Sequence, residues 1–200
     1  MSFLIGTIIG ATAILLYLTE TDRLVAMAAP RPRAPMAAAA LAPAGPSEAL
    51  LMPVDGVLPG QLKSTFNESR GGGFRTHQAI DILAPRGTPV RAAVAGTVRK
   101  LFTSAAGGLT IYEFDRPEER CYYYAHLDRY ADDLREGMTV AQGDVIGYVG
   151  TTGNAPPGTP HLHFAISILP PTKEWWRGTP IDPYPLLVHA NNAEAAAAGR

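Results

Sequence analysis

The chain has 200 residues, 46% of them hydrophobic, which is enough for one domain of ordinary size with additional segments. It carries 17 lysines and arginines against 18 aspartates and glutamates, and this balance excludes the basic surplus that is typical of nucleic-acid-binding proteins. The single cysteine, Cys121, excludes an internal disulfide and a structural zinc site built on cysteines. From the balance of charges we expect no nucleic-acid partner.

The first segment, residues 1–27, contains an apolar run from Phe3 to Leu18 without a charged residue. The run is slightly short for a membrane-spanning helix, which needs about 20 residues, and slightly long for the apolar core of a signal peptide. A small-residue cleavage site at residues 26–28 is separated from the run by charged residues. These features favour an uncleaved N-terminal hydrophobic helix that anchors the protein in the cytoplasmic membrane, with a cleaved signal segment as the alternative.

Two further segments have compositions that do not support a folded core. Residues 28–47 are rich in alanine and proline, which predicts a solvated linker. Residues 190–200 are mostly alanine without an apolar period, which predicts a flexible tail. The folded domain is therefore expected at residues 48–189.

Within residues 48–189, short apolar runs alternate with turn signals, which predicts a mostly β domain with antiparallel strands and many tight turns. In chain order we expect two short strands about a bend in residues 87–98. Further strands are expected in residues 109–114, 121–127, 145–149 and 161–168. Residues 128–136 are compatible with one or two helical turns.

The first candidate site residues are His77 and Asp81, in a segment with β-strand character. Because side chains alternate faces along a strand, these two are expected on one face while Ile80 and Ile82 point into the core. The spacing His-X-X-X-Asp arises often by chance. It therefore indicates a site only in combination with other motifs.

Histidines recur in two later strands. His161 and His163 form a His-X-His motif, which places both rings on one face of an alternating strand. His126 lies at the end of a tyrosine-rich strand, where alternation predicts that it shares a face with Tyr122 and Tyr124. A single histidine on a strand is usually structural, but three such groups in one small domain favour a common site.

The residue types suit a catalytic metal ion. Zinc accepts imidazole nitrogen and carboxylate oxygen, and a catalytic zinc usually has three protein ligands and one open position. Two histidines and one aspartate from neighbouring strands satisfy that count. The remaining histidines can then transfer protons near the bound water.

Three longer stretches carry a resemblance to a known family. They are FRTHQAIDILAPRGTPVRAAVAGTV (residues 74–98), YYYAHLD (residues 122–128) and GMTVAQGDVIGYVGTTGNAPPGTPHLHFAI (residues 137–166). Together and in this order they resemble the M23 family of lysostaphin-like metallopeptidases, over roughly residues 58–168. The resemblance implies a small antiparallel β domain of the barrel-sandwich type with an open groove.

The resemblance also implies roles for five residues. One zinc ion per chain would be held by His77, Asp81 and His163. His161 would act as general base toward the zinc-bound water, and His126 would orient that water or stabilise the charge on the scissile carbonyl oxygen. A bound zinc lowers the pKa of its water to about 7, so a neutral imidazole can take the proton.

One position departs from the family pattern. Ala79 stands where the family usually has glycine, two residues after the first histidine. If Ala79 lies on the ligand face, its methyl group crowds the metal or the substrate. Because alanine is the smallest change from glycine, we expect the site to tolerate it.

The expected function is a zinc-dependent endopeptidase that hydrolyses peptide cross-links of peptidoglycan during cell-wall remodelling. The anchor and linker predict a location in the cell envelope, at the outer face of the cytoplasmic membrane or in the periplasm, with peptidoglycan as the partner. The sequence identifies neither the bond that is cut nor a regulatory protein partner.

Two rival functions follow from the same sequence. One is a non-catalytic scaffold or activator of another wall hydrolase, which the retention of all five site positions disfavours. The other is a carrier of biotin or lipoyl groups, which uses similar glycine-rich turns but needs a lysine at an exposed hairpin tip. None of Lys63, Lys100 and Lys173 has such a setting.

Overall fold

A computed structural model of the protein describes residues 50–189. The predicted N-terminal hydrophobic helix, the linker of residues 28–47 and the tail of residues 190–200 lie outside the described residues. In the described part of the chain, no helix is both long enough and apolar enough to cross a membrane. The prediction of an anchor therefore stays a prediction.

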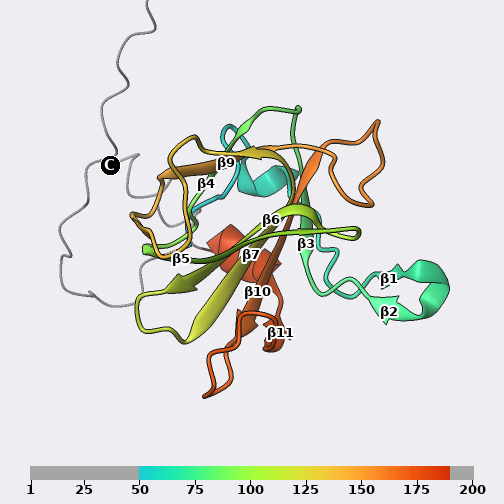
Figure 1. Ribbon diagram of the computed structural model, residues 1–200. Helices are drawn as coiled ribbons and strands as arrows, with labels where there is room; N and C mark the ends of the chain where they lie inside the picture. The colour runs from blue at the N-terminus through green and yellow to red at the C-terminus, as the bar shows by residue number, and fades with distance from the viewer. Residues whose placement is uncertain (1–49, 190–200) are drawn as a thin grey trace, which may run out of the picture. The chain divides into compact units, whose positions relative to one another are not determined.

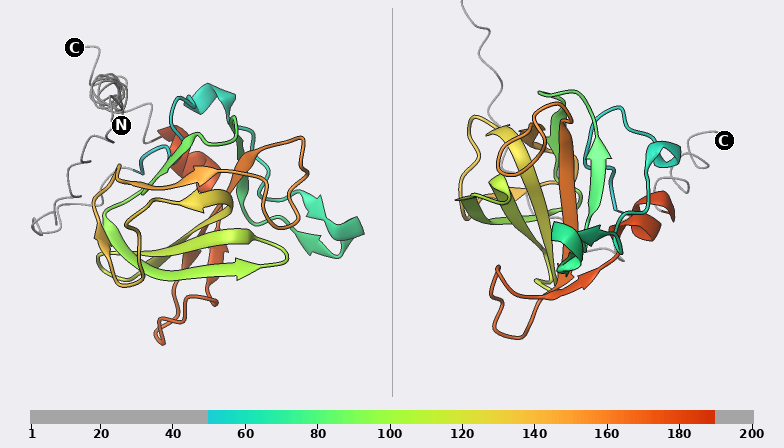
Figure 2. Two further views of the ribbon diagram at one scale, coloured as in Figure 1. Left: turned by 45° about the horizontal axis from the view of Figure 1, so that its top comes forward. Right: turned by 90° about the vertical axis from the view of Figure 1, so that its right-hand side faces the viewer.

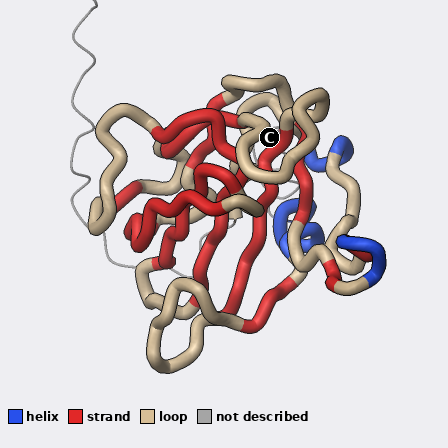
Figure 3. Tube along the Cα trace, turned by 45° about the vertical axis from the view of Figure 1, so that its right-hand side comes forward, coloured by secondary structure: helices blue, strands red, loops and turns tan. Residues whose placement is uncertain are grey.

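The described residues form an antiparallel β structure, as the sequence predicted (Figure 1). A small hairpin consists of β1 (Ser69–Arg70) and β2 (Arg75–Thr76). The large sheet consists of β3 (Ile80–Leu83), β4 (Pro89–Arg91), β5 (Gly96–Ser104), β6 (Gly108–Asp115), β7 (Arg120–Tyr130), β8 (Thr139–Val140), β9 (Val145–Val149), β10 (His161–Ile168) and β11 (Thr179–Ile181). Helical segments are short: Pro59–Gln61, Gly71–Gly73 and residues 183–189 (Figure 3).

The long strand β7 organises the large sheet. The strand order is β11-β10-β7-β6-β5-β8, with β3 paired to β10 and β4 paired to β9. The first half of β7 lies between β6 and β10, whereas its second half pairs with β9. Because β7 serves three neighbours, the two halves of the sheet curve around a shared interior.

One predicted element is wrong. Residues 128–136 do not form a helix: β7 continues through Tyr130, and the residues after it form turns. The reason is tertiary, because Arg129 and Tyr130 pair with Tyr148 and Gly147 of β9. Ladder hydrogen bonds to β9 satisfy backbone groups that a short isolated helix would leave exposed at its ends.

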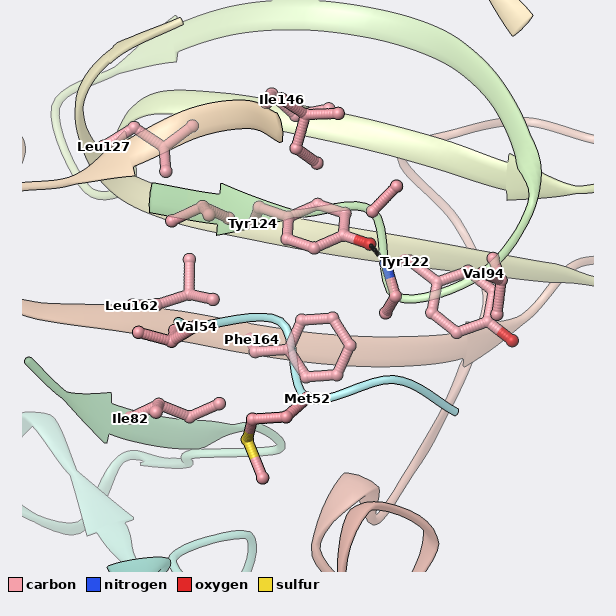
Figure 4. Close-up of a cluster of buried hydrophobic side chains, with 14 of the residues drawn as sticks. Met52, Val54, Ile82, Val94, Tyr122, Tyr124, Leu127, Ile146, Leu162 and Phe164 are labelled. Atoms are coloured by element: carbon pink, nitrogen blue, oxygen red, sulfur yellow. Dashed lines mark hydrogen bonds between the residues drawn. The ribbon is translucent and has the colours of Figure 1, made fainter. Parts of the chain in front are cut away.

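The core lies where side chains of the curved sheet converge from opposite strands (Figure 4). On β10, Leu162, Phe164 and Ile166 are fully buried, as strand alternation predicted. Their partners come from β3, β7, β9 and the segment before the hairpin, and include Met52, Val54, Ile80, Ile82, Tyr122, Tyr124, Leu127 and Ile146. This apolar side fixes β10 so that its other face carries the histidines.

A buried carboxyl group interrupts this core. Glu113 of β6 is fully buried, and its Oε2 accepts a hydrogen bond of 2.6 Å from the hydroxyl group of Tyr124. That hydroxyl in turn accepts a hydrogen bond of 2.9 Å from the backbone N–H of Ala93. The second oxygen, Oε1, has no hydrogen-bonding partner in the described part of the chain. Burial raises the pKa of Glu113 from 4.5 to about 8, so the folded protein keeps this carboxyl group protonated at neutral pH.

This shift predicts a dependence of stability on pH. The folded state holds a proton on Glu113 that the unfolded state releases above pH 4.5, so the free energy of unfolding should fall as the pH rises from about 4.5 to about 8. The slope is at most about 1.4 kcal/mol per pH unit. Replacing Glu113 by glutamine, which is neutral and nearly isosteric, should remove this contribution.

The measurement is urea unfolding of the full chain between pH 5 and pH 8, with a chelator in every sample. The matched control is Glu119→Gln, which removes an exposed carboxyl group on the loop before β7 and should leave the slope unchanged. Equal slopes for the wild type and the Glu113 variant would contradict a protonated Glu113.

Candidate metal centre

The register of three neighbouring strands brings the first two candidate ligands together. His163 of β10 lies directly opposite Asp81 of β3. On its other side His163 lies opposite Ala125 of β7, the residue that precedes His126. Because directly opposite residues of an antiparallel pair have their Cβ atoms only about 5 Å apart, the row Asp81–His163–Ala125 is fixed by backbone pairing.

His77 reaches the same place by a turn and not by the strand alternation that the sequence predicted. It lies between β2 and β3, and the residue after it, Gln78, has φ 57°, in the left-handed region. The backbone N–H groups of His77 and Gln78 donate to the carbonyl oxygens of Glu68 and Phe66, each at 2.9 Å. After this turn the chain enters β3 with the side chain of Asp81 toward the site and that of Ile80 toward the core.

Ala79 does not lie on the ligand face, so the crowding that its methyl group would cause there does not arise. Its side chain is fully buried and does not line the cavity at the site. The left-handed turn at Gln78 redirects the chain, so the methyl group lies in the protein interior. Ala79 therefore does not narrow the space around the candidate ligands.

Three side-chain atoms form a nearly equilateral triangle. Nε2 of His77 lies 3.0 Å from Nδ1 of His163 and 3.0 Å from Oδ1 of Asp81, and the last two atoms are 3.1 Å apart. The three residues could hold a metal ion. In a tetrahedral zinc site with ligands at about 2.0–2.1 Å, the distance between two ligand atoms is about 3.3 Å. The donor set and its spacing thus fit zinc, with one face left open.

A backbone carbonyl group and an arginine side chain orient two of these ligands from the side opposite the triangle. Nδ1 of His77 lies 3.1 Å from the carbonyl oxygen of Thr65 and 3.2 Å from Nη2 of Arg70. When the Nδ1 proton is donated to the carbonyl oxygen, the Nε2 lone pair is left for the site. Arg70 donates a hydrogen bond of 2.9 Å to Oδ2 of Asp81, the oxygen that faces away from the triangle. This contact favours binding of a metal through Oδ1 alone.

His126 lines the cavity and, contrary to the prediction from strand alternation, does not share a face of β7 with Tyr122 and Tyr124. The pairing of β7 with β6 shifts register between Leu109 and Ile111, and His126 has φ 60°. Positive φ is strained for a residue other than glycine, and a bulge of this kind redirects a side chain. Tyr122 and Tyr124 remain in the core, whereas His126 turns toward His163, with ring centroids 5.6 Å apart.

His126 and His161 share an arrangement that leaves one nitrogen of each ring available. Nδ1 of His126 lies 2.8 Å from the carbonyl oxygen of Thr152, and Nδ1 of His161 lies 2.8 Å from that of Thr159. A carbonyl oxygen only accepts, so both Nδ1 atoms carry protons, and Nε2 of each neutral ring has a free lone pair. Nε2 of His161 is 3.8 Å from Oδ1 of Asp81, and the two rings lie 4.9 Å apart.

The protonation states of the site suit a divalent cation. Burial acts to raise the pKa of Asp81, but hydrogen bonds and charge interactions with His163 and His77 outweigh it and hold the pKa well below its usual value. Burial lowers the pKa of His163, and it lowers that of His126 from 6.5 to about 4. At neutral pH Asp81 is therefore a carboxylate, and His126 and His163 are neutral imidazoles; metal binding requires these states of its ligands.

The triangle lies in a cavity of about 490 Å³. Residues of the hairpin β1–β2 line one side of the cavity, and residues of the loop between β9 and β10 line another. Both segments lie on the right-hand side of Figure 1, where β3 also lies, and face the viewer in the right-hand view of Figure 2. Lining residues are Arg70, Arg75, His77, Asp81, Leu83, Ala106, Gly107, Tyr123, Ala125, His126, Asn154, Ala155, Pro156, Thr159, His161 and His163. All five site residues that the sequence predicted thus face one cavity.

Comparison with known proteins decides the family. The profile described as Peptidase family M23 matches residues 75–183, more than half of the 200 residues and a span that contains every residue of the triangle. The chain belongs to peptidase family M23. The family resemblance and the lysostaphin-like fold expected from the sequence are confirmed.

Two curated relatives and one solved structure illustrate the family. The chain is 37% identical over 131 residues to the L-Ala–D-Glu endopeptidase of Bacillus subtilis (strain 168), covering 62% of this chain and 39% of the relative. It is 33% identical over 112 residues to the peptidoglycan DD-endopeptidase ShyC of Vibrio cholerae, covering 54% and 25%. The structure of the antimicrobial peptidase lysostaphin from Staphylococcus simulans matches with a TM-score of 0.53 at 27% identity, covering 65% and 50%. The chain thus spans well under half of these two curated relatives.

Within this M23 domain, sequence reasoning missed the residues that orient the histidines. Thr65, Thr152 and Thr159 act through backbone carbonyl oxygens, so no side-chain pattern marks them. Arg70 is a further residue of this kind: it binds Asp81, and no motif in the sequence indicates that contact. Tyr123 also lines the cavity, although its neighbours Tyr122 and Tyr124 are buried in the core. Strict alternation between the buried Tyr122 and Tyr124 would have identified it.

The contact between Arg70 and Asp81 predicts a change in metal affinity. Replacing Arg70 by glutamine should weaken zinc binding about 10- to 100-fold, the usual effect of losing a residue that orients a metal ligand. The measurement is zinc competition with a chromogenic chelator on the full chain. Arg75→Gln removes the same charge from the same hairpin and should bind zinc as the wild type does. Equal weakening in both variants would assign the effect to net charge.

Proposed function

We propose that this protein is a zinc-dependent endopeptidase that hydrolyses an amide bond in the peptide part of peptidoglycan. The observation that carries the proposal is the triangle formed by His77, Asp81 and His163 beside two histidines whose Nε2 atoms are free. A purely structural cluster does not require three ligand atoms about 3 Å apart at the edge of a cavity. Three protein ligands with an open position are the pattern of catalytic zinc.

Each residue then has a chemical role. His77, Asp81 and His163 would hold zinc, which when bound lowers the pKa of water and polarises a carbonyl group. His161 accepts the proton of the attacking water through Nε2, because its Nδ1 is committed to Thr159. His126, held in the same way on Thr152, donates a hydrogen bond toward the developing oxyanion once it is protonated, or orients the water.

The substrate class rests on the relatives. The Bacillus subtilis relative is named for the bond between L-Ala and D-Glu, and the Vibrio cholerae relative is named a peptidoglycan DD-endopeptidase. Both names describe endopeptidases with different target bonds, and the second names peptidoglycan as the substrate. For this chain we therefore propose a wall peptide as substrate without assigning the bond. The apolar run of residues 3–18 supports a location at the outer face of the cytoplasmic membrane or in the periplasm.

The division between metal ligand and base is testable by paired substitutions. His163→Ala should lower zinc affinity and abolish hydrolysis, because it removes one corner of the triangle. His161→Ala should retain zinc at wild-type stoichiometry and lose at least about 100-fold in turnover. Zinc content is measured by elemental analysis and turnover by release of peptide fragments. Full activity of the His161 variant would refute the general-base assignment.

The activity itself is tested on purified sacculi. The full chain is incubated with sacculi with and without a chelator, and released fragments are identified by mass spectrometry. Loss of cross-linked fragments that the chelator prevents and added zinc restores is the expected result, and the fragment masses name the bond. If stoichiometric zinc is bound and no fragment is released, the proposal of wall hydrolysis by this chain alone is refuted.

A further inference from the structure

One of the two arginines at the cavity has a side chain without a partner in the described part of the chain. Arg75 of β2 is exposed and lines the cavity, yet its side chain makes no hydrogen bond or ion pair within the described residues. Its neighbour across the hairpin, Arg70, contacts Glu68 at 3.0 Å, Asp81 at 2.9 Å and Nδ1 of His77 at 3.2 Å. The hairpin thus brings two guanidinium groups to one cavity and neutralises only one.

The register of the hairpin places the two arginines where their charges repel each other, which does not stabilise the fold. Arg70 and Arg75 are directly opposite in the β1–β2 pair. Like charges at directly opposite positions destabilise a strand pair, and a two-residue ladder has few other contacts to offset the repulsion. Stability of the hairpin therefore does not explain an arginine at position 75, whereas a ligand that brings a negative charge does.

The charge of the cavity points the same way. Among the described residues that line it, Asp81 is the only acidic one, and its two oxygens face His77, His163 and Arg70. Arg75 thus leaves an uncompensated positive charge at the rim, and a bound metal ion adds to it. Such a cavity attracts an anionic group on a substrate.

We propose that Arg75 is a specificity-determining residue that binds a carboxylate of the substrate peptide near the scissile bond. This inference rests on the proposed function and adds a substrate feature to it. The planar guanidinium group matches a carboxylate in a two-point contact, which a carboxamide cannot reproduce. The other walls of the cavity at Leu83, Ala106, Ala155 and Pro156 are apolar. They suit small side chains such as the methyl group of alanine beside that carboxylate.

The carboxylate could belong to an acidic residue inside the peptide or to the C-terminus. The experiment uses a synthetic copy of the cross-linked fragment that the full chain cleaves in sacculi, prepared in three forms. In the first all carboxylates are free, in the second the internal α-carboxylate of D-glutamate is a carboxamide, and in the third the terminal carboxylate is a carboxamide. Steady-state hydrolysis is measured for the wild type and for Arg75→Gln.

We expect the Arg75 substitution and the amidation of one carboxylate to lower kcat/KM by the same factor. Arg75→Gln should lower kcat/KM about 10- to 100-fold on the free form, mainly through KM, as the loss of a hydrogen bond to a charged group predicts. The wild type should lose the same factor on one of the two amidated forms, and the substitution should have no further effect on that form. The form that responds identifies the source of the carboxylate.

Two control variants separate this role from others. Lys63→Gln removes an exposed positive charge that does not line the cavity, and it should behave as the wild type on all three forms. Arg75→Lys keeps the charge without the two-point geometry and should recover part of the loss. Zinc content is measured in each variant, because Arg75 makes no contact with the triangle and its loss should leave zinc binding unchanged.

The outcomes distinguish the two proposals. If Arg75→Gln lowers hydrolysis of all three forms equally, or of none, carboxylate recognition is refuted while the endopeptidase function stands. If the wild type releases nothing from sacculi, the proposed function fails first, and no substrate form is defined for this experiment.

Discussion

The antiparallel register of β3, β10 and β7 is the constraint on which the site depends. It fixes Asp81 opposite His163 and His163 opposite Ala125. The two ladders of backbone hydrogen bonds on either side of β10 thus bring two candidate ligands together and place His126 beside them. The apolar side of β10 enforces this register, because a slip by one residue would exchange Leu162 and Phe164 with the histidines. Core packing and site geometry are therefore two consequences of the same alternation.

The remaining parts of the site depart from regular strands. His77 enters through the left-handed turn at Gln78, and His126 turns to the site through a bulge with positive φ. Strained conformations of this kind cost about 1–3 kcal/mol each and persist where the surrounding structure fixes them. Here the fixing contacts are backbone carbonyl oxygens: those of Thr65, Thr152 and Thr159 each accept from an Nδ1 atom and leave the opposite nitrogen to the cavity.

The β1–β2 hairpin adds charge to this framework. Arg70 neutralises the outer oxygen of Asp81, while Arg75 faces the cavity without an acidic partner in the described structure. A site that combines a fixed carboxylate, neutral imidazoles and a free guanidinium group is suited to a substrate that carries negative charge. The hairpin lies outside the large sheet, so variation there can alter substrate preference without disturbing the register of β3, β10 and β7.

The sequence by itself determined the β class, the strands at residues 145–149 and 161–168, and the five residues that face the cavity. Apolar alternation marks the strands and the order of the three motifs marks the site residues, and both are local properties of the sequence. Tertiary structure alone decided the rest. Pairing with β9 extended β7 through Tyr130 where a helix was expected, and the bulge moved His126 off the face that alternation assigned. The turn at Gln78 buried Ala79, and Arg70 joined Asp81 across two strands. Each of these outcomes depends on partners distant in sequence or on a backbone bend, and a side-chain pattern encodes neither.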